Sequence, residues 1–276
     1  TASLDDVLKM WAGLGYYRRA RFIHAAALQI VEEGMPETSA GWLALPGVGR
    51  YTAGAIGSIA FGEVVPVVDG NVKRVFARFL AWPEDPTSSR SEKLFWGAAG
   101  ILVDPERPGD FNQALMELGA TVCKPKNPLC SVCPLQESCA GFATGSATDF
   151  PAPKRRKTKQ RVETRHVALI VRDASIWAVR TPADGLLGGL WGFPEASSLD
   201  DLLAMFPNSE GADFIPLGQV KHVFSHIRMT YVAYRFQGLS LEPQTDAAAW
   251  IEVRDLSSLG MSRAMAKVAA LLSSET

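Results

Sequence analysis

Apolar residues recur at helical spacing along the first half of the chain. Between residues 4 and 33 they stand three and four positions apart, in two stretches that Gly13 and Gly15 separate. Further helices are predicted on both sides of a turn at 45–49, over 69–80 and over 111–122. This pattern predicts an all-helical domain over residues 1–142.

The pattern changes after residue 142. Residues 143–165 are rich in small, polar and basic side chains, and they indicate a solvated linker, with DNA contact by the run 154–157 as the alternative. Short β-branched and aromatic runs predict strands at 167–171, 176–179, 220–224, 229–236 and 250–253, with helices at 199–206 and 262–272. An α/β domain over residues 166–276 therefore follows the helical domain.

Length and composition agree with two domains in a soluble protein. The 276 residues are 47% hydrophobic, enough for two modest cores. No apolar run reaches the roughly 18 residues of a membrane span, and no secretory signal opens the chain, so we expect a cytoplasmic protein. Up to Arg165 there are 20 basic and 17 acidic residues, against 8 and 12 after it. The basic excess therefore lies in the first part, where a nucleic-acid backbone is expected to bind.

All four cysteines fall in one short stretch, with the spacing C-x6-C-x2-C-x5-C from Cys123 to Cys139. Clustered cysteines indicate a metal site rather than a disulfide framework. Four thiolates can ligate zinc or a [4Fe–4S] cluster. Structural zinc usually takes two close cysteine pairs, and only Cys130 and Cys133 form one here, so the spacing favours the cluster and leaves zinc open.

Two further segments carry chemistry in the first domain. Gly47 and Gly49 flank Val48 in a tight turn before a predicted helix, whose free N–H groups can face a phosphate. About twenty residues later Asp69 precedes another predicted helix, where it serves as an N-cap. A carboxylate fixed by capping can also stabilise an oxocarbenium-like sugar when a glycosidic bond breaks.

The tight turn at residues 45–49 with the helices on both sides of it forms a helix-hairpin-helix motif. This hairpin, the downstream aspartate and the cysteine loop together resemble the endonuclease III and MutY repair glycosylases. The resemblance implies that Asp69 is the catalytic carboxylate and that Asn71 supports it. It implies a [4Fe–4S] cluster on Cys123, Cys130, Cys133 and Cys139. It also implies DNA contacts by Gly47, Val48, Gly49, Tyr51, Lys73, Lys124 and Lys126.

Other motifs resemble the MutY family of adenine DNA glycosylases in particular. Tyr51 stands where bifunctional relatives carry a Schiff-base lysine, which indicates a monofunctional glycosylase. The motif Gly13-Leu-Gly-Tyr-Tyr implies that Tyr16 wedges into the duplex. The C-terminal motifs resemble the family's Nudix-like domain: Phe224, Ser225 and His226 would recognise 8-oxoguanine, and Gly189 would approach the DNA backbone.

The resemblance implies a monomeric base-excision repair enzyme, associated with the bacterial nucleoid, that acts on double-stranded DNA. It would hydrolyse the glycosidic bond of adenine mispaired with 8-oxoguanine or guanine. The family's general acid is a glutamate in an N-terminal segment that has no match in this sequence. A missing acid costs about 10²–10⁴-fold in rate, so we expect little or no adenine release by residues 1–276 alone.

Three other functions are weighed against this one. An endonuclease III-like glycosylase would share the hairpin and the cluster, but Tyr51 and the C-terminal domain argue against it. A Nudix hydrolase needs a glutamate-rich Mg²⁺-binding helix, and Glu195, Asp200 and Asp201 do not have that spacing. The third function is that of a DNA-binding fragment without catalysis. Binding that discriminates 8-oxoguanine, without release of the base, would support this function.

Overall fold

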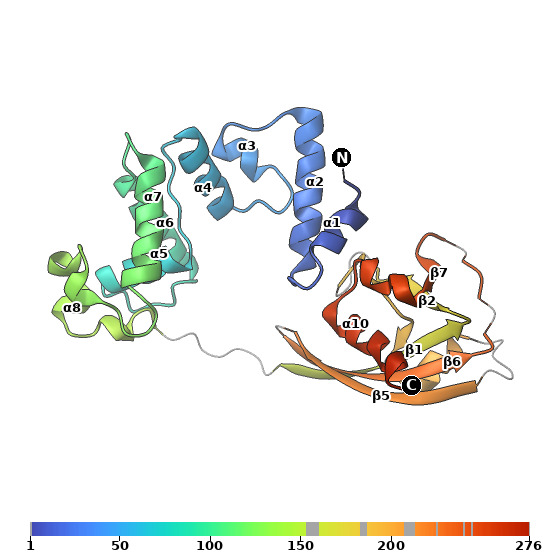
Figure 1. Cartoon of the computed structure of the whole chain (residues 1–276). Helices are drawn as coiled ribbons and strands as arrows, with labels where there is room; N and C mark the ends of the chain where they lie inside the picture. The colour runs from blue at the N-terminus through green and yellow to red at the C-terminus, as the bar shows by residue number, and fades with distance from the viewer. Residues whose placement is uncertain are drawn as a thin grey trace. The chain divides into compact units, whose positions relative to one another are not determined.

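The computed structural model describes residues 2–152, 160–182, 187–206, 213–224, 226–239, 241–243 and 245–275. The basic run 154–157 and Ser225 lie outside these residues. The chain forms two compact units, one of residues 25–157 and one of residues 1–24 with 158–276. Figure 1 shows the helices of the first and the mixed sheet of the second.

The unit of residues 25–157 is helical. It contains most of α2 (Tyr17–Glu33), then α3 (Ser39–Leu43), α4 (Arg50–Phe61), α5 (Gly70–Phe79), α6 (Ser89–Leu102), α7 (Pro108–Glu117) and α8 (Ala140–Ala143). A π turn, η1 (Leu118–Val122), follows α7, and 3-10 turns lie at η2 (Cys130–Val132), η3 (Gln136–Ser138) and η4 (Ala147–Asp149). Its core lies between α5 and α6, where the rings of Phe76 and Phe95 stack at 6.0 Å.

Asn112 fixes the segment that leads from α4 to α5. Its side chain is 1% exposed. Its Oδ1 accepts from the Val67 amide at 3.1 Å, while its Nδ2 donates to Ser58 Oγ and to the Val65 carbonyl, both at 2.9 Å. A buried amide with its bonding groups paired holds the backbone in one position. The chain therefore enters α5 from a fixed direction.

The second unit is built on a mixed sheet. Its strands are β1 (Arg161–Arg172), β2 (Ser175–Arg180), β3 (Trp191–Gly192), β4 (Glu195–Ala196), β5 (Asp213–Val223), β6 (Ile227–Gln237) and β7 (Ala248–Glu252). The order is β3-β2-β1-β6-β5, with β4 paired to β1 and β7 to β2, and β1 runs parallel to β6. Turns η5 (Val253–Ser258) and η6 (Ala270–Glu275) flank the last helix.

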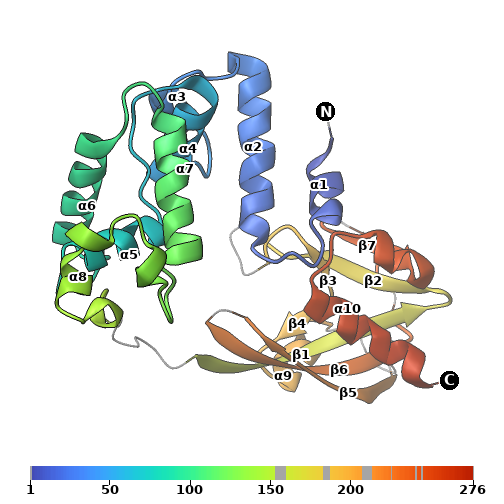
Figure 2. The same ribbon diagram turned by 60° about the vertical axis from the view of Figure 1, so that its left-hand side comes forward.

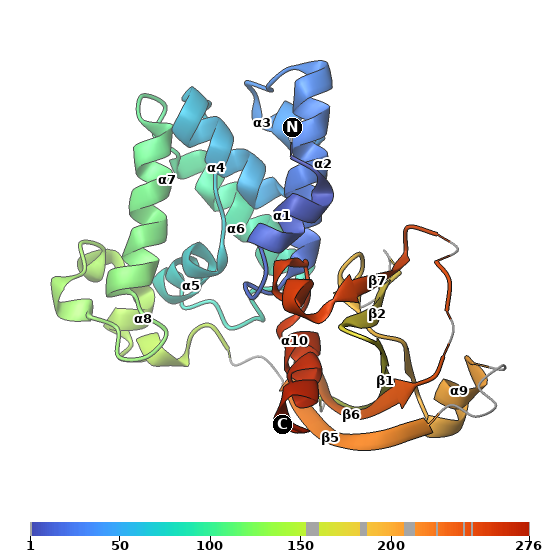
Figure 3. The same cartoon turned by 45° about the vertical axis from the view of Figure 1, so that its right-hand side comes forward.

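Two helices cover opposite faces of this sheet, α9 (Leu199–Ala204) and α10 (Arg263–Ala269) (Figures 2 and 3). Alternate residues of β1 explain the arrangement, because successive side chains of a strand point to opposite faces. Val167 and Leu169 pack with α10 residues, whereas Ala168 and Ile170 pack in the cluster that contains Leu202 of α9. Both sheet faces are therefore apolar.

Residues of α1 (Leu4–Met10) and the start of α2 pack within the second unit. Leu8 and Ala20, 1% and 0% exposed, cluster with Leu190. Arg180 pairs with the Asp5 carboxylate, and Arg21 donates to a backbone carbonyl of the loop before β3. The limits 1–142, 143–165 and 166–276 drawn from the sequence stay a prediction.

Most predicted elements are present, and the main differences concern β1, α7 and α6. β1 begins at Arg161, before the expected position 167, because it pairs with β6 from Ile227 onward. The helix predicted over 111–122 is α7 followed by a π turn. α6, capped by Ser88, was not predicted. Among the described residues, every helix is too short or too polar to cross a bilayer.

Candidate functional site

The turn between α3 and α4 presents open backbone. Gly47 has φ +76°, which lets the chain turn without a Cβ penalty. Gly49 is the N-cap of α4 without a side-chain cap, and nothing lies within 4 Å of where its Cβ would be. The first amides of α4 and its positive dipole end are therefore available to an anion. The predicted arrangement of Gly47, Val48 and Gly49 is suited to a phosphate.

Asp69 is fixed at the start of α5 by two hydrogen bonds. Its Oδ1 accepts from the Val72 amide at 2.7 Å, and its Oδ2 accepts from Asn71 Nδ2 at 2.9 Å. The residue is partly exposed, so the carboxylate can be reached. The two predicted residues are therefore in direct contact, and Asn71 orients the carboxylate.

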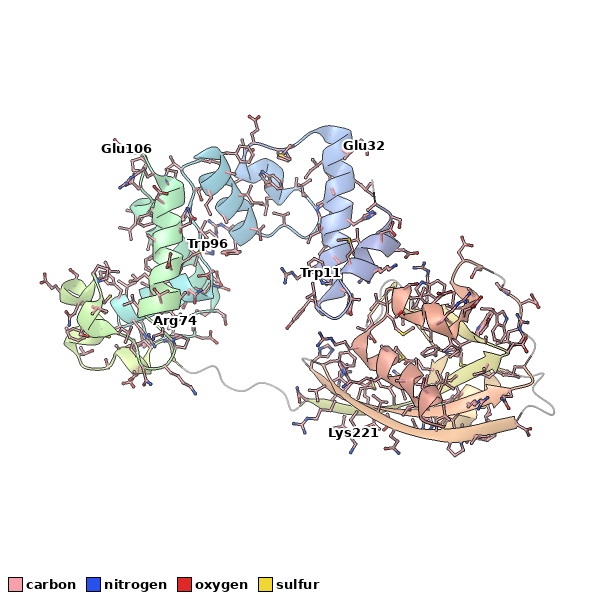
Figure 4. The ribbon with its side chains drawn as sticks, viewed as in Figure 1. Trp11, Glu32, Arg74, Trp96, Glu106 and Lys221 are labelled. Atoms are coloured by element: carbon pink, nitrogen blue, oxygen red, sulfur yellow. The ribbon has the colours of Figure 1, made fainter. Side chains whose placement is uncertain are left out.

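Arg74 connects this pair to the cysteine loop. Its Nη2 donates to Asn71 Oδ1 at 2.9 Å and to the Gly119 carbonyl at 2.7 Å, and its Nε donates to the Cys123 carbonyl at 2.8 Å. Figure 4 shows the labelled Arg74 beside the end of α7 that leads into this loop. Burial lowers the pKa of the guanidinium, with the charge of Arg78 contributing. The geometry joins Asp69, Asn71, Arg74 and Cys123 in one polar chain.

The π turn after α7 makes this connection possible. A Cβ on Gly119 would lie 2.7 Å from Asn71 Cβ and 3.0 Å from the Asn71 backbone. Only glycine fits at that distance, and the wider π turn aims its carbonyl at Arg74. Sequence reasoning missed Arg74 and Gly119, because their partners are distant along the chain.

Basic residues near the hairpin have protein partners. Lys73 pairs with Glu92, and Trp96 Nε1 donates to the same carboxylate at 3.1 Å. The Arg50 guanidinium lies 3.9 Å from the centre of the Trp96 ring. Tyr51 is 42% exposed, and its hydroxyl lies 3.6 Å from Met116 Sδ. A DNA contact by Lys73 or Tyr51 stays a prediction.

The cysteines surround one small cavity. Cys123, Cys130, Cys133 and Cys139 all line it, together with apolar side chains and Arg78. Burial raises the pKa of the Cys130 thiol, and the other three cysteines add to the effect, as expected for thiols brought together. Within the described residues, no three His, Cys, Asp or Glu side chains group closely enough for a single metal ion. Four separate thiols around a cavity fit the donor set of an iron–sulfur cluster.

The side chain of Arg78 holds the backbone of the cysteine loop through hydrogen bonds. It is 2% exposed, and its guanidinium donates to the carbonyls of Lys124, Pro125 and Phe150 at 2.7, 3.1 and 2.9 Å. Its Nη1 also lies 3.4 Å from Cys123 Sγ. The predicted contact residue Lys124 is thus held through its carbonyl, while Lys126 is exposed.

In the second unit, Tyr16 is accessible. Its side chain is 71% exposed, and its φ is +49° in the turn before α2. The neighbouring Tyr17 is 6% exposed and accepts from the Gly13 amide at 3.0 Å. Of the two tyrosines, Tyr16 alone has the exposure that a wedge needs.

The turn between β5 and β6 carries Phe224 and His226. Phe224 N–H donates to the Ile227 carbonyl at 2.8 Å, and its ring contacts the His222 ring at a centroid distance of 4.6 Å. The His226 carbonyl accepts from the Arg161 amide at 3.1 Å, and the His226 side chain is exposed. The start of β1 therefore braces this turn, which sequence reasoning did not foresee.

Gly189 lies in the loop before β3. Its φ is +78°, and a Cβ there would meet Leu8 and Arg21 at 3.9 Å. Its amide donates to the Thr181 carbonyl at 2.9 Å. The glycine thus serves a turn packed against the N-terminal segment, and its approach to DNA stays a prediction.

Family models match three parts of the chain. Residues 1–99 match the HhH-GPD superfamily of base excision DNA repair proteins. Residues 123–139 match the iron–sulfur binding domain of endonuclease III, and residues 166–271 match the NUDIX domain. The chain therefore combines a helix-hairpin-helix glycosylase domain with a Nudix-like domain. Its cofactor is a [4Fe–4S] cluster.

Two similar proteins are adenine DNA glycosylases. The adenine DNA glycosylase of Homo sapiens is 38% identical, over 97% of this chain and 60% of the relative. That of Schizosaccharomyces pombe is 34% identical, over 93% of this chain and 68% of the relative. A thermostable thymine-DNA glycosylase structure is 28% identical, with a TM-score of 0.47, over 52% of this chain and 67% of that one. The chain spans about three fifths of the human relative's length.

Proposed function

This chain belongs to the adenine DNA glycosylase family, and from that membership we propose that it acts in base excision repair as a monofunctional glycosylase. It hydrolyses the N-glycosidic bond of adenine paired with 8-oxoguanine or guanine in double-stranded DNA. The observation that carries the proposal is the carboxylate of Asp69, fixed by Asn71 and the Val72 amide beyond the hairpin.

Asp69 stabilises the sugar cation. As the glycosidic bond breaks, positive charge develops on the sugar, and a preorganised carboxylate stabilises that charge without reorganising. Asn71 and Arg74 hold its orientation through the hydrogen bonds described above. Water then attacks the sugar and leaves an abasic site. Tyr51 occupies the position of a Schiff-base lysine, so the strand stays intact.

DNA is held by residues of both units in this proposal. Gly47, Val48 and Gly49 bind a backbone phosphate, with Tyr51, Lys73, Lys124, Lys126 and Gly189 contributing contacts. Tyr16 wedges into the base stack while adenine is flipped out. Phe224, Ser225 and His226 read 8-oxoguanine. The cluster, held by Cys123, Cys130, Cys133 and Cys139, is a structural support for the loop that contains Lys124 and Lys126.

The test measures adenine release from a duplex with adenine opposite 8-oxoguanine, using the cluster-loaded chain. Release followed by strand breaks only after alkali supports the proposal, and breaks without alkali contradict a monofunctional enzyme. Since release by residues 1–276 alone is expected to be weak, affinity is measured alongside. Equal affinity for the mispaired duplex and for a fully paired duplex would overturn the proposal.

A further inference from the structure

The turn between α1 and α2 is held both from within and by α10. Trp11 Nε1 donates to the Gly15 carbonyl at 2.9 Å, and Figure 4 shows the labelled Trp11 where α1 leads toward α2. Arg263, the first residue of α10 in the same unit, lies against Gly13: a Cβ on that glycine would be 2.9 Å from Arg263 Nε. Tyr16, which is 71% exposed, therefore projects from a turn that α10 contacts.

Three exposed arginines flank this turn. The Arg18 guanidinium lies 5.0 Å from the centre of the Phe22 ring. The Arg19 guanidinium lies 5.9 Å from the centre of the Trp11 ring, and both distances are those of cation–π contacts. Across the described part of the chain, the guanidinium groups of Arg18, Arg19 and Arg263 form no hydrogen bond or ion pair. These three residues, named the arginine surface, therefore have their donors available to a ligand.

The chain around the arginine surface carries charge of one sign. Residues 7–31 contain four lysines and arginines and no aspartate or glutamate, and residues 256–274 contain two and again no acid. Both carboxylates of α1, Asp5 and Asp6, already accept hydrogen bonds within the protein. A surface with several cations and no opposing carboxylate favours an anionic partner.

We propose that the arginine surface binds the phosphodiester backbone of duplex DNA beside the base step that Tyr16 enters. A guanidinium presents two parallel N–H donors, which match two oxygens of one phosphate. A side chain that wedges into the stack distorts the duplex, and phosphate contacts next to it hold the distorted strand. Arg263 makes such a contact from α10, so the C-terminal part of the chain also binds the backbone at the wedge.

Duplex DNA fits this surface better than an acidic protein segment does. The charges surround an exposed aromatic ring, that of Tyr16, and stacked bases offer flat surfaces to such a ring, whereas a run of carboxylates does not. The chain also belongs to a family of DNA glycosylases. The inference rests on the proposed function for the place of Tyr16 in the stack, whereas the phosphate contacts themselves are tested separately.

The experiment measures DNA affinity of the chain loaded with its iron–sulfur cluster, by fluorescence anisotropy between about 50 and 200 mM salt. The duplexes are one with adenine opposite 8-oxoguanine and one that is fully paired. Arg18→Met and Arg263→Met keep an unbranched stem and remove the charge. Each should weaken binding of both duplexes several-fold and lower the slope of log K against log salt by about one. Arg263→Lys should keep the slope, because it keeps the charge, and lose less affinity than Arg263→Met.

The matched control is Arg172→Met. Arg172 is exposed and lies 4.1 Å from the centre of the Trp250 ring, so it is also an arginine on an aromatic support in the same unit. It stands at the opposite end of β2 from Arg180, the residue that pairs with α1. This variant should keep both affinity and salt slope. An equal loss in Arg172→Met would show a general effect of net charge and overturn the proposal.

Neutral methylphosphonates, placed singly at each phosphate near the mispair, locate the contact. The unmodified chain should lose affinity at the phosphate that Arg263 binds, and Arg263→Met should be insensitive to the change at that position. Thermal melting should be the same for all variants, because the substituted side chains are exposed. A scan in which no phosphate is coupled to Arg18 or Arg263 would overturn the proposal.

The outcomes also separate this inference from the proposed function. If the unmodified chain prefers the mispaired duplex and the arginine variants bind like it, the inference fails and the glycosylase proposal stands. If the variants lose affinity but the unmodified chain has no preference for the mispair, the arginine surface stands and the glycosylase proposal fails. Loss of binding to polyglutamate with undiminished DNA affinity would assign the surface to an acidic protein and overturn the inference.

Discussion

At the scale of single residues, the aspartate at the N-terminus of α5 both caps the helix and carries the proposed chemistry. Asp69 caps α5 through one oxygen and receives Asn71 on the other. The capping bond explains why the local sequence places a carboxylate there, and the second bond orients it. Asp69 therefore contributes both to helix stability and to the proposed reaction, and the two contributions can be separated by substitution.

We predict that Asp69→Asn keeps the fold and lowers the residual adenine release of the unmodified chain. An asparagine still caps the helix, so the cost in stability should stay below about 1 kcal/mol. It carries no charge to stabilise the sugar cation, so release should fall by roughly 10²-fold or more. Single-turnover kinetics on the cluster-loaded chain measures the change in adenine release, and thermal melting measures the change in stability. A variant that releases adenine at an undiminished rate would exclude Asp69 as the catalytic carboxylate.

Glu195 predicts a pH dependence of stability. Burial raises the pKa of its carboxyl above the ordinary value of 4.5, against the opposing charge of Arg165. The folded chain therefore binds more protons than the unfolded chain between the two pKa values, and this group makes stability fall as pH rises through that window. Glu195→Gln should be more stable than the unmodified chain at neutral pH.

Urea unfolding of both proteins between pH 4 and pH 8 measures the difference. The gap should narrow as pH falls through the ordinary value of 4.5, because Glu195 becomes neutral in both states only below that value. Glu242→Gln, at an exposed position, should leave stability unchanged throughout. A Glu195→Gln variant that is less stable at neutral pH would show a favourable carboxylate contact instead.

At the scale of elements, the cysteine loop depends on α5 for its position. Arg78 bonds three carbonyls of the loop and its flank, and Arg74 bonds the Cys123 carbonyl. Both arginines are one turn apart on α5, so one helix holds both the loop and the Asp69 pair. Loss of Arg78 leaves several buried carbonyls without donors.

We predict that Arg78→Met destabilises the loop by about 2–4 kcal/mol and lowers iron content. Iron and sulfide per chain, and the visible absorption of the cluster, are the measurements. Arg90→Met, at a side chain 74% exposed, should keep its iron. Full cluster occupancy with unchanged stability in Arg78→Met would contradict the structural role given to this guanidinium.

The π turn gives a second element-scale prediction. In Gly119→Ala the new methyl would meet Asn71 Cβ at 2.7 Å, so Asn71 and the Asp69 carboxylate must shift. Since a misplacement of about 1 Å can cost roughly 10²-fold, adenine release should fall by tenfold or more. Gly97→Ala, with nothing within 4 Å, is the matched control and should stabilise α6 by about 0.5–1 kcal/mol. Equal rates for the two variants would show that Asn71 tolerates the shift.

At the scale of the whole molecule, the chain has two units with separate cores. Phe76 and Phe95 lie in the helical core, whereas Leu169 and Phe236 lie in the cores on the two sheet faces. Proteins with separate cores commonly depart from two-state unfolding. The cluster belongs to the helical unit alone, because all four cysteines fall within residues 25–157.

We predict two thermal transitions, of which one depends on the cluster. Removing iron by oxidation and chelation should lower the transition of residues 25–157 and leave that of the second unit in place. Glu195→Gln should shift only the second transition. Differential scanning calorimetry of the chain with and without its cluster measures both transitions. A single transition that moves as a whole would show that the two units unfold together.

What the sequence determined by itself is local. The hairpin turn, the Asp69 cap, the cysteine spacing and most strands and helices depend on residues within about a dozen positions of one another, where periodicity and turn chemistry act directly. The sequence also predicted the all-helical and α/β parts, and the family comparisons confirm both.

What only the tertiary structure decided is which distant groups meet. Arg74 reaches carbonyls 45 and 49 positions away, and Asn112 reaches an amide 45 positions away. Glu195 and Tyr231 line one cavity because β4 and β6 both pair with β1. Such contacts depend on strand register and on the path of the π turn. No local pattern encodes them, since each partner alone is an ordinary polar residue.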